Sequence, residues 1–145
     1  MTTNSYIIVQ RTRGTWAQIY CSTDGHLHHT GGLLERHYNT QELAEAVVAP
    51  GDMWYLDTRC NKPDGHSFDH PVNGYSVYFG RDRGDLNSEP HIGASLAAVW
   101  PRGIVGCELA YVWKIDGGWH VGNVASGPHG LHSLHLALAD VPFKV

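Results

Sequence analysis

The sequence predicts an α+β domain in which two β-hairpins and a central strand form an antiparallel sheet with two to four short helices packed on it. Seventeen glycines in 145 residues exceed the ordinary share of about 7% and indicate many tight turns between short strands. Hydrophobic residues make up 42% of the chain, which suits one globular domain over residues 1–145. Apolar residues alternate in some segments and recur every three or four residues in others, which predicts both strands and helices.

The first half of the chain begins with a predicted hairpin. Residues Tyr6–Gln10 and Thr15–Cys21 are rich in β-branched and aromatic residues, and they flank the turn Arg11–Gly14. Glycines and histidines then break the periodicity across Ser22–Gly32, which predicts a loop or the approach to a helix. A short helix is expected around Leu33–Tyr38, because its apolar residues share one face.

A second helix should follow Asn39-Thr40, which is a good N-terminal cap. Its apolar stripe would contain Leu43, Ala44, Val47 and Val48, and Pro50-Gly51 would end it. Asp52–Asp57 is apolar but too short to assign. The long segment Thr58–Gly74 is rich in proline and glycine and predicts a loop, which at this length is more often functional or ordered than idle.

The second half of the chain contains the predicted central strand, Tyr75–Gly80, with Tyr75, Val77 and Phe79 on one face. We expect a two-turn helix over Ala94–Trp100, because Pro101 would end it. Further along, Lys114-Ile-Asp-Gly-Gly118 marks a hairpin between two strands, and the chain should finish as an amphipathic helix. The two strands of this hairpin are expected at Glu108–Trp113 and Trp119–Val124, and the helix at Leu131–Val141.

The charged run after the central strand is the strongest candidate for a binding site. Arg81, Asp82, Arg83 and Asp85 follow Tyr78 at the end of the predicted strand. In an extended chain the two arginines point the same way, so one cationic edge would meet a phosphate or carboxylate. The alternative is a turn closed by internal salt bridges, and arginine suits both roles. A tryptophan exposed near this run would add a protein-binding hot spot.

The chain has eleven histidines, and one group offers metal-ligand chemistry. His66, Asp69 and His70 provide two imidazoles and a carboxylate, a set that zinc accepts. On a loop this spacing carries little specificity, and Asp69 is equally suited to capping backbone donors in a turn. We therefore expect the turn, with no bound metal and no cofactor.

Charge, cysteines and the N-terminus limit the remaining possibilities. A net charge of −4 with 17% charged residues argues against direct nucleic-acid binding. Cys21, Cys60 and Cys107 are widely spaced and odd in number, which predicts reduced thiols rather than disulfides. The first residues lack the basic and apolar regions of a signal peptide, and no apolar run approaches the ~20 residues of a membrane span, so we expect a soluble, intracellular protein.

Several motifs together resemble a group of small accessory proteins carried by tailed phages and prophages. The motifs include Gly32-Leu-Leu-Glu-Arg-His-Tyr-Asn39 and Gly80-Arg-Asp-Arg-Gly-Asp85, and the likeness covers most of the chain. This chain differs from the group in its histidines near residues 26 to 29. The resemblance implies an accessory protein of a phage or mobile element that is made in the bacterial cytoplasm and acts on a host protein or a host defence.

Three functional hypotheses follow. The first is a non-enzymatic protein that binds and inhibits a bacterial host protein stoichiometrically, with anti-defence inhibition, such as of a CRISPR complex, as the leading form. The second is a small metal-dependent hydrolase that uses histidines and acids. The third is a protein that sequesters a nucleotide signal through Arg81, Arg83 and aromatic faces. We expect binding rather than catalysis, through Tyr78, Arg81, Asp82, Arg83 and Asp85.

Overall fold

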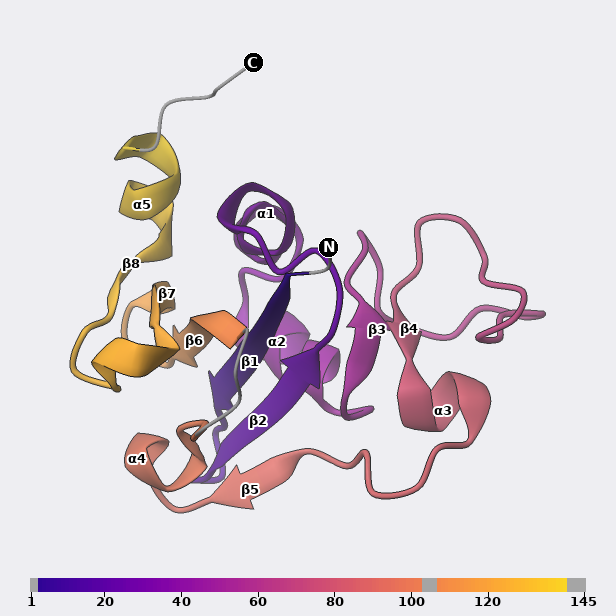
Figure 1. The fold of residues 1–145 in the computed structure, drawn as a ribbon, viewed down its shortest axis with the longest axis horizontal. Coiled ribbons are helices and arrows are strands. Elements are labelled where there is room, and N and C mark those ends of the chain that lie inside the picture. Colours follow the sequence, from indigo (N-terminus) through magenta and orange to yellow (C-terminus); the bar gives the residue numbers. More distant parts are fainter. Residues whose placement is uncertain (1–2, 103–106, 141–145) are drawn as a thin grey trace.

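The computed structural model describes residues 3–102 and 107–140 (Figure 1). Its strands are β1 (Asn4–Gln10), β2 (Trp16–Cys21), β3 (Met53–Tyr55), β4 (Val77–Tyr78), β5 (His91–Gly93), β6 (Cys107–Lys114), β7 (Gly118–Asn123) and β8 (His132–Ser133). Its helices are α1 (Gly32–His37), α2 (Gln41–Val48), α3 (Phe79–Arg83), α4 (Leu96–Val99) and α5 (Leu134–Asp140). Two further turns are a π-helical turn at Leu27–Gly31 and a 3₁₀ turn at Val124–Ser126. In these described ranges, no helix is both long and apolar enough to cross a bilayer.

The strands form one mixed sheet in the order β4-β3-β2-β1-β6-β7-β8, with β5 paired to β2. The hairpin β1–β2 is antiparallel and pairs Tyr6 with Tyr20 and Gln10 with Trp16. The hairpin β6–β7 is also antiparallel, with Trp113 opposite Trp119. The two hairpins are joined by a parallel pairing of β1 with β6. The predicted α+β class is confirmed, and the sheet is mostly antiparallel rather than wholly so.

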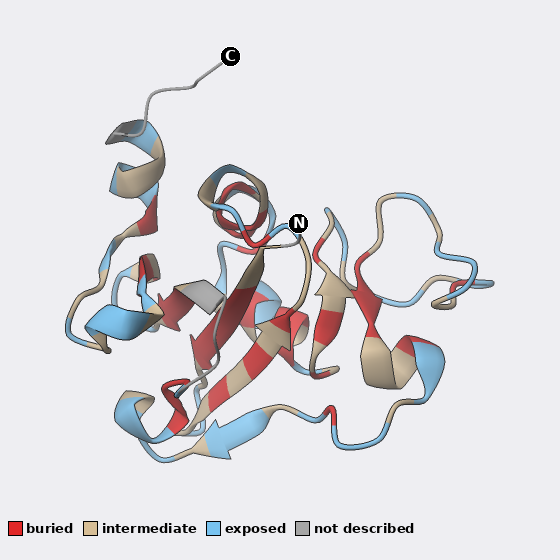
Figure 2. Cartoon of the chain, in the orientation of Figure 1, coloured by how far each residue is buried: buried red, intermediate tan, exposed pale blue. Residues whose placement is uncertain are grey.

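Strand β1 is the middle strand of the sheet order, and its apolar residues are buried on both faces of the sheet. Ile7 and Val9 belong to a larger core with α1, α2 and α5, and Tyr6 and Ile8 belong to a smaller core with α4. A near-continuous apolar run is what a strand covered on both sides requires. Figure 2 shows the buried residues running along β1, β2 and β6, whereas β5 is largely exposed.

The predicted central strand, Tyr75–Gly80, is wrong in both length and place. The extended pairing covers Val77–Tyr78, and this short β4 stands at the end of the sheet. Val77 and Tyr78 are both fully buried. The chain then turns at Phe79 into α3.

Two helices begin later than predicted, and two short strands were not predicted. The last helix starts at Leu134, because the preceding residues pair with β7 as β8, and its predicted end at Val141 lies outside the described residues. The helix predicted over Ala94–Trp100 is the single turn α4. Strands β3 and β5 have three residues each, a length at which alternation gives no usable signal.

Helix α2 matches its sequence signals closely. The Thr40 side chain accepts a hydrogen bond from the Leu43 backbone N–H, as the predicted cap requires. Ala44, Val47 and Val48 are buried against the sheet. Leu43 is 38% exposed, so it does not belong to the buried stripe that the sequence predicts.

The side chain of Asp52 accepts a backbone hydrogen bond from β2 in the gap between two short strands that pair with the same edge of β2. Strand β5 pairs with Trp16–Gln18, and β3 pairs at Cys21. Between them, the Tyr20 N–H donates to Asp52 Oδ1 at 2.9 Å. A carboxylate oxygen thus takes the place of a strand carbonyl. Burial, and to a smaller extent the nearby Glu89, raises the pKa of Asp52.

Asp52→Asn should raise the melting temperature at pH 7. A raised pKa in the folded protein means that the charged carboxylate opposes folding, and this cost appears as pH rises through that pKa. The asparagine oxygen still accepts from Tyr20 without the charge. Thermal melts at pH 7 and pH 3.5 should show a gain that shrinks at the lower pH. Asp52→Ala, which removes the acceptor, should lower the melting temperature at both values, and a gain for alanine would contradict the role assigned to the oxygen.

Candidate functional site

Helix α3 places the two predicted arginines on opposite sides. Successive helical residues are rotated by about 100°, so Arg81 and Arg83 differ by about 200°. Gly84 ends the helix in the left-handed conformation, at φ 84°, and its N–H donates to the carbonyl oxygens of Gly80 and Phe79. The single cationic edge expected from an extended chain is therefore wrong. Arg81 faces the interior of the protein, and Arg83 faces outward.

A buried polar cluster lies beneath α3 and is centred on Asp82. The side chain of Asp82 is fully buried. Its Oδ2 accepts hydrogen bonds from the Tyr78 N–H at 2.8 Å and from Arg81 Nη2 at 3.0 Å. Arg81 Nε donates to the other carboxylate oxygen, Oδ1, at 2.8 Å. By accepting from Tyr78, the residue preceding the helix, Asp82 also satisfies one of the unpaired N–H groups at the start of α3.

Arg81 connects this cluster to two other segments. Its Nη1 donates to the Cys60 carbonyl oxygen at 2.7 Å, and its Nη2 lies 3.4 Å from the Ser76 carbonyl oxygen. The guanidinium carbon lies 4.6 Å from the centre of the Tyr78 ring. Burial alone would raise the pKa of Asp82, but the hydrogen bonds and charge of Arg81 outweigh it and lower that pKa. Arg81 therefore forms an internal salt bridge with Asp82, as the alternative reading of the charged run predicts.

His66 brings the long loop onto the same cluster. Its Nδ1 accepts the Val72 N–H at 3.0 Å, so its Nε2 carries the proton. Nε2 lies 3.2 Å from the Ser76 carbonyl oxygen and 3.3 Å from Asp82 Oδ2. Both ring nitrogens therefore hold the loop in place, and neither faces solvent.

Arg83 lies on the outer side of α3 in an aromatic setting. Its guanidinium carbon lies 4.2 Å from the centre of the Phe68 ring and 5.0 Å from that of Phe79. Nε and Nη2 donate to the two carboxylate oxygens of Asp85 at 2.8 and 2.7 Å. The Arg83 side chain remains 45% exposed. This is a bidentate pair with fixed geometry at the surface.

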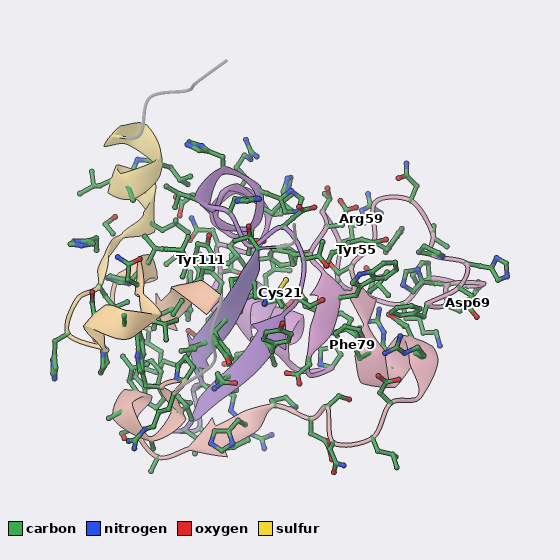
Figure 3. All side chains as sticks on the ribbon, viewed as in Figure 1. Cys21, Tyr55, Arg59, Asp69, Phe79 and Tyr111 are labelled. Atoms are coloured by element: carbon green, nitrogen blue, oxygen red, sulfur yellow. The ribbon has the colours of Figure 1, made fainter. Side chains whose placement is uncertain are left out.

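The aromatic rings around Arg83 form a continuous cluster. Phe68 stacks on Trp54 with ring centres 4.5 Å apart, and it lies 6.0 Å from Phe79. Tyr55 lies beside Trp54 at 5.3 Å. Figure 3 shows Tyr55, Arg59, Asp69 and Phe79 at the end of the molecule formed by β3, β4, α3 and the long loop, away from Tyr111. The four stacked or adjacent rings and the arginine over them are called the aromatic face below: Trp54, Tyr55, Phe68, Phe79 and Arg83.

The predicted site residues therefore divide into two groups. Tyr78 and Asp82 are buried, and the Tyr78 hydroxyl donates to the Val47 carbonyl oxygen at 2.6 Å. They support α3 from beneath, together with Arg81. Arg83 and Asp85 are the more exposed side chains, at 45% and 35%.

The three histidine-loop residues do not converge. His66 is buried, whereas Asp69 and His70 are exposed. The His70 N–H donates to the Ser67 hydroxyl oxygen at 3.1 Å, so Ser67 rather than Asp69 caps this turn. Across residues 3–102 and 107–140, no three His, Cys, Asp or Glu side chains gather closely enough to hold a metal ion.

The two cysteines whose side chains are described, Cys21 and Cys60, show no sign of nucleophilic activation. Cys21 is a buried free thiol, and burial raises its pKa to about 12. A thiol with that pKa stays protonated at neutral pH and is a poor nucleophile. Cys60 is half-buried and its pKa is also raised by burial, while the side chain of Cys107 lies outside the described residues.

Sequence reasoning missed the aromatic contributors from the loop and from β3. Phe68 and Trp54 are fourteen positions apart and belong to segments without clear periodicity. The available signal was the adjacent aromatic pair Trp54-Tyr55 in a short apolar segment, which the structure shows to be part of β3. Comparisons with protein-family models, with curated proteins and with solved structures found no match to this chain.

Proposed function

We propose that this chain is a binding protein that acts stoichiometrically on a partner protein through the aromatic face. The observation that carries this proposal is the position of Arg83, which lies over Phe68 and Phe79 and is still 45% exposed. Aromatic residues and arginine are the residue types most enriched at the energetic centres of protein interfaces. The alternative is a small secondary core under a long loop, which would leave partner binding unaffected by changes at Arg83.

The rigidity of this face supports binding. His66 fixes the loop through Val72, and Asp82 and Arg81 fix α3 through Tyr78 and Cys60. A surface that is already ordered loses little conformational entropy on association. In this proposal Tyr78, Arg81 and Asp82 position the face, and Arg83 and Asp85 contact the partner.

The partner class comes from the resemblance of the motifs at residues 32–39 and 80–85 to accessory proteins of phages and prophages. In that setting the partner is a protein of the bacterial host, and the chain inhibits it by occupying its surface. A defence complex, such as a CRISPR complex, is the leading form of this proposal. The nucleotide-binding hypothesis has less support, because Arg81 and Arg83 do not share one surface.

Arg83→Ala should weaken association with the partner at least about tenfold, since arginine is a frequent hot-spot residue in desolvated interfaces. The tagged protein would be expressed in bacteria, and a partner that co-elutes in a 1:1 complex would be identified and purified. Affinity would then be measured by calorimetry. The melting temperature should change little, because the Arg83–Asp85 pair is exposed.

Arg13→Ala provides the matched control, because Arg13 is an exposed arginine in the turn between β1 and β2. Equal affinities for the Arg83 and Arg13 variants would exclude the aromatic face as the contact surface. Failure of the wild-type protein to retain any stoichiometric partner would refute the proposed function.

A further inference from the structure

Leu86 is the most exposed large apolar side chain in the described part of the chain. It is 86% exposed, at the tip of the loop Gly84–Pro90 that joins α3 to β5. Neither hydrophobic core of the described residues contains it. Isolated exposed apolar residues are common on protein surfaces, so exposure alone indicates nothing. The structure of the loop around Leu86 is what distinguishes it.

The loop is fixed on both sides of Leu86. The Asp85 N–H donates to the Phe79 carbonyl oxygen at 3.1 Å, immediately before the tip. Immediately after it, Asn87 adopts a positive φ of 60°. The Ser88 hydroxyl donates to the Asp85 carbonyl oxygen at 3.3 Å, which closes the turn.

The same loop is tied to the sheet through Ser88. The Ser88 carbonyl oxygen accepts the Asp52 N–H at 2.8 Å, directly before β3. An added Cβ at Gly51 or at Gly80 would collide with Ser88, so the chain passes close to both glycines. Leu86 is therefore presented in a fixed position rather than on a mobile loop, which is the arrangement that makes an apolar anchor effective.

The surroundings of Leu86 carry an excess of negative charge. Asp85 and Glu89 line the same surface hollow of about 370 Å³ as Leu86. The guanidinium groups of Arg81 and Arg83 are paired with Asp82 and Asp85. Glu89 is the other acid of this hollow, and none of the salt bridges among the described residues involves it. It also lies near enough to Asp52 to contribute to the raised pKa of that carboxyl group. A phosphate-rich surface would be repelled here, whereas a basic protein surface would be attracted.

We infer that Leu86 is an anchor that inserts into an apolar pocket of the partner protein, and that lysine or arginine side chains of the partner surround that pocket. This inference rests on the proposed function, because it requires a protein partner. Leu86 lies on the chain directly after the Arg83–Asp85 pair, so one partner surface can cover both. Burying a leucine side chain in a pocket of the partner increases the apolar area of the interface that Arg83 and the aromatic residues form, and burial of apolar area favours association.

Affinity for the purified partner provides the first test. Leu86→Ala should weaken binding at least about tenfold, as loss of a central apolar anchor does. Wild-type affinity should also fall as salt is raised from about 50 to about 500 mM, because salt screens the attraction to basic groups. Leu136→Ala is the matched control, since Leu136 is 60% exposed on α5 and α5 lies at the other end of the molecule from α3 (Figure 1). Equal affinity for the two variants would overturn the inference.

Site-specific photocrosslinking provides the second test, and it separates the two possible failures. A benzophenone amino acid would replace Leu86 in one variant and Leu136 in another, each expressed in the bacterial cell. An adduct with the partner from position 86 and not from position 136 supports the inference when Leu86→Ala also weakens binding. A wild-type complex without an adduct at 86 overturns the inference and leaves the proposed function standing. The absence of both complex and adduct overturns both.

Discussion

Asp82→Ala should lower the free energy of unfolding by about 3 kcal/mol at neutral pH, the lower end of the range for removing one partner of a buried ion pair. Asp82 accepts hydrogen bonds from the Tyr78 N–H and the Arg81 guanidinium, and it lies 3.3 Å from His66 Nε2. Without it, the N–H of Tyr78 and the charge of Arg81 lose their acceptor. The lower end applies because the Arg81 side chain is 20% exposed and recovers some hydration.

Urea unfolding measured across pH would check both the size and the sign of this effect. Arg81 lowers the pKa of Asp82 in the folded protein despite its burial. A carboxyl group with a lowered pKa stabilises the fold above its ordinary pKa of about 3.9, and this contribution is lost as pH falls through the lowered value. The difference between wild type and Asp82→Ala should therefore be constant near neutrality and shrink below about pH 4.

Asp85→Ala is the matched control for Asp82, because it removes the carboxylate of the exposed pair that Arg83 forms with the loop directly after α3. Exposed pairs contribute little to stability, so its melting temperature should stay close to wild type. If Asp82→Ala and Asp85→Ala lost equal stability, burial of the Asp82 ion pair would add nothing to its contribution. Asp82→Asn should fall between wild type and alanine, since it keeps an acceptor oxygen and loses the charge.

Gly51→Ala should destabilise the protein by about 3 kcal/mol through two separate costs. Gly51 has a φ of +96°, where a side chain adds about 1–2 kcal/mol of backbone strain. Its added Cβ would also collide with the Ser88 carbonyl oxygen, which is held by the Asp52 N–H. Overpacking against fixed atoms costs about 1–3 kcal/mol. Chemical denaturation at pH 7 would measure the total.

Gly14→Ala separates the two costs. Gly14 also has a positive φ, +84°, and an added Cβ there meets no atom within 4 Å. Its loss of stability should therefore report backbone strain alone and be roughly 1 kcal/mol. If both variants lost the same amount, the close approach of Ser88 to Gly51 would carry no energetic cost. Because Ser88 also fixes the Leu86 loop, Gly51→Ala should weaken partner binding as well.

The candidate site could be predicted from the sequence in part. The charged run that follows the predicted strand Tyr75–Gly80 was singled out from the sequence, and in an extended chain its two arginines, Arg81 and Arg83, would lie on one side. Helix α3 reverses this, because Asp82 accepts the Tyr78 N–H and Gly84 ends the helix after one turn. A five-residue helix has too few residues for periodicity to reveal it.

What the sequence alone determined is local. The pairing of β1 with β2, the pairing of β6 with β7, and the capping of α2 by Thr40 all depend on residues a few positions apart. Turn glycines, alternating apolar residues and side-chain caps act over such distances without help from the rest of the chain. The order of residues is therefore enough to predict these elements.

What only the tertiary structure decided involves residues distant in the chain. The parallel pairing of β1 with β6 brings Ile7 beside Tyr111, and His66 meets Asp82 across a long loop. Parallel strands carry no turn signal, because their connection is long and its path depends on how the helices pack. A buried histidine and a buried aspartate look like surface residues in a sequence, since charged groups are buried only where a partner is in place. Tertiary packing therefore made β1 the central strand and placed Arg83, rather than Arg81, on the surface.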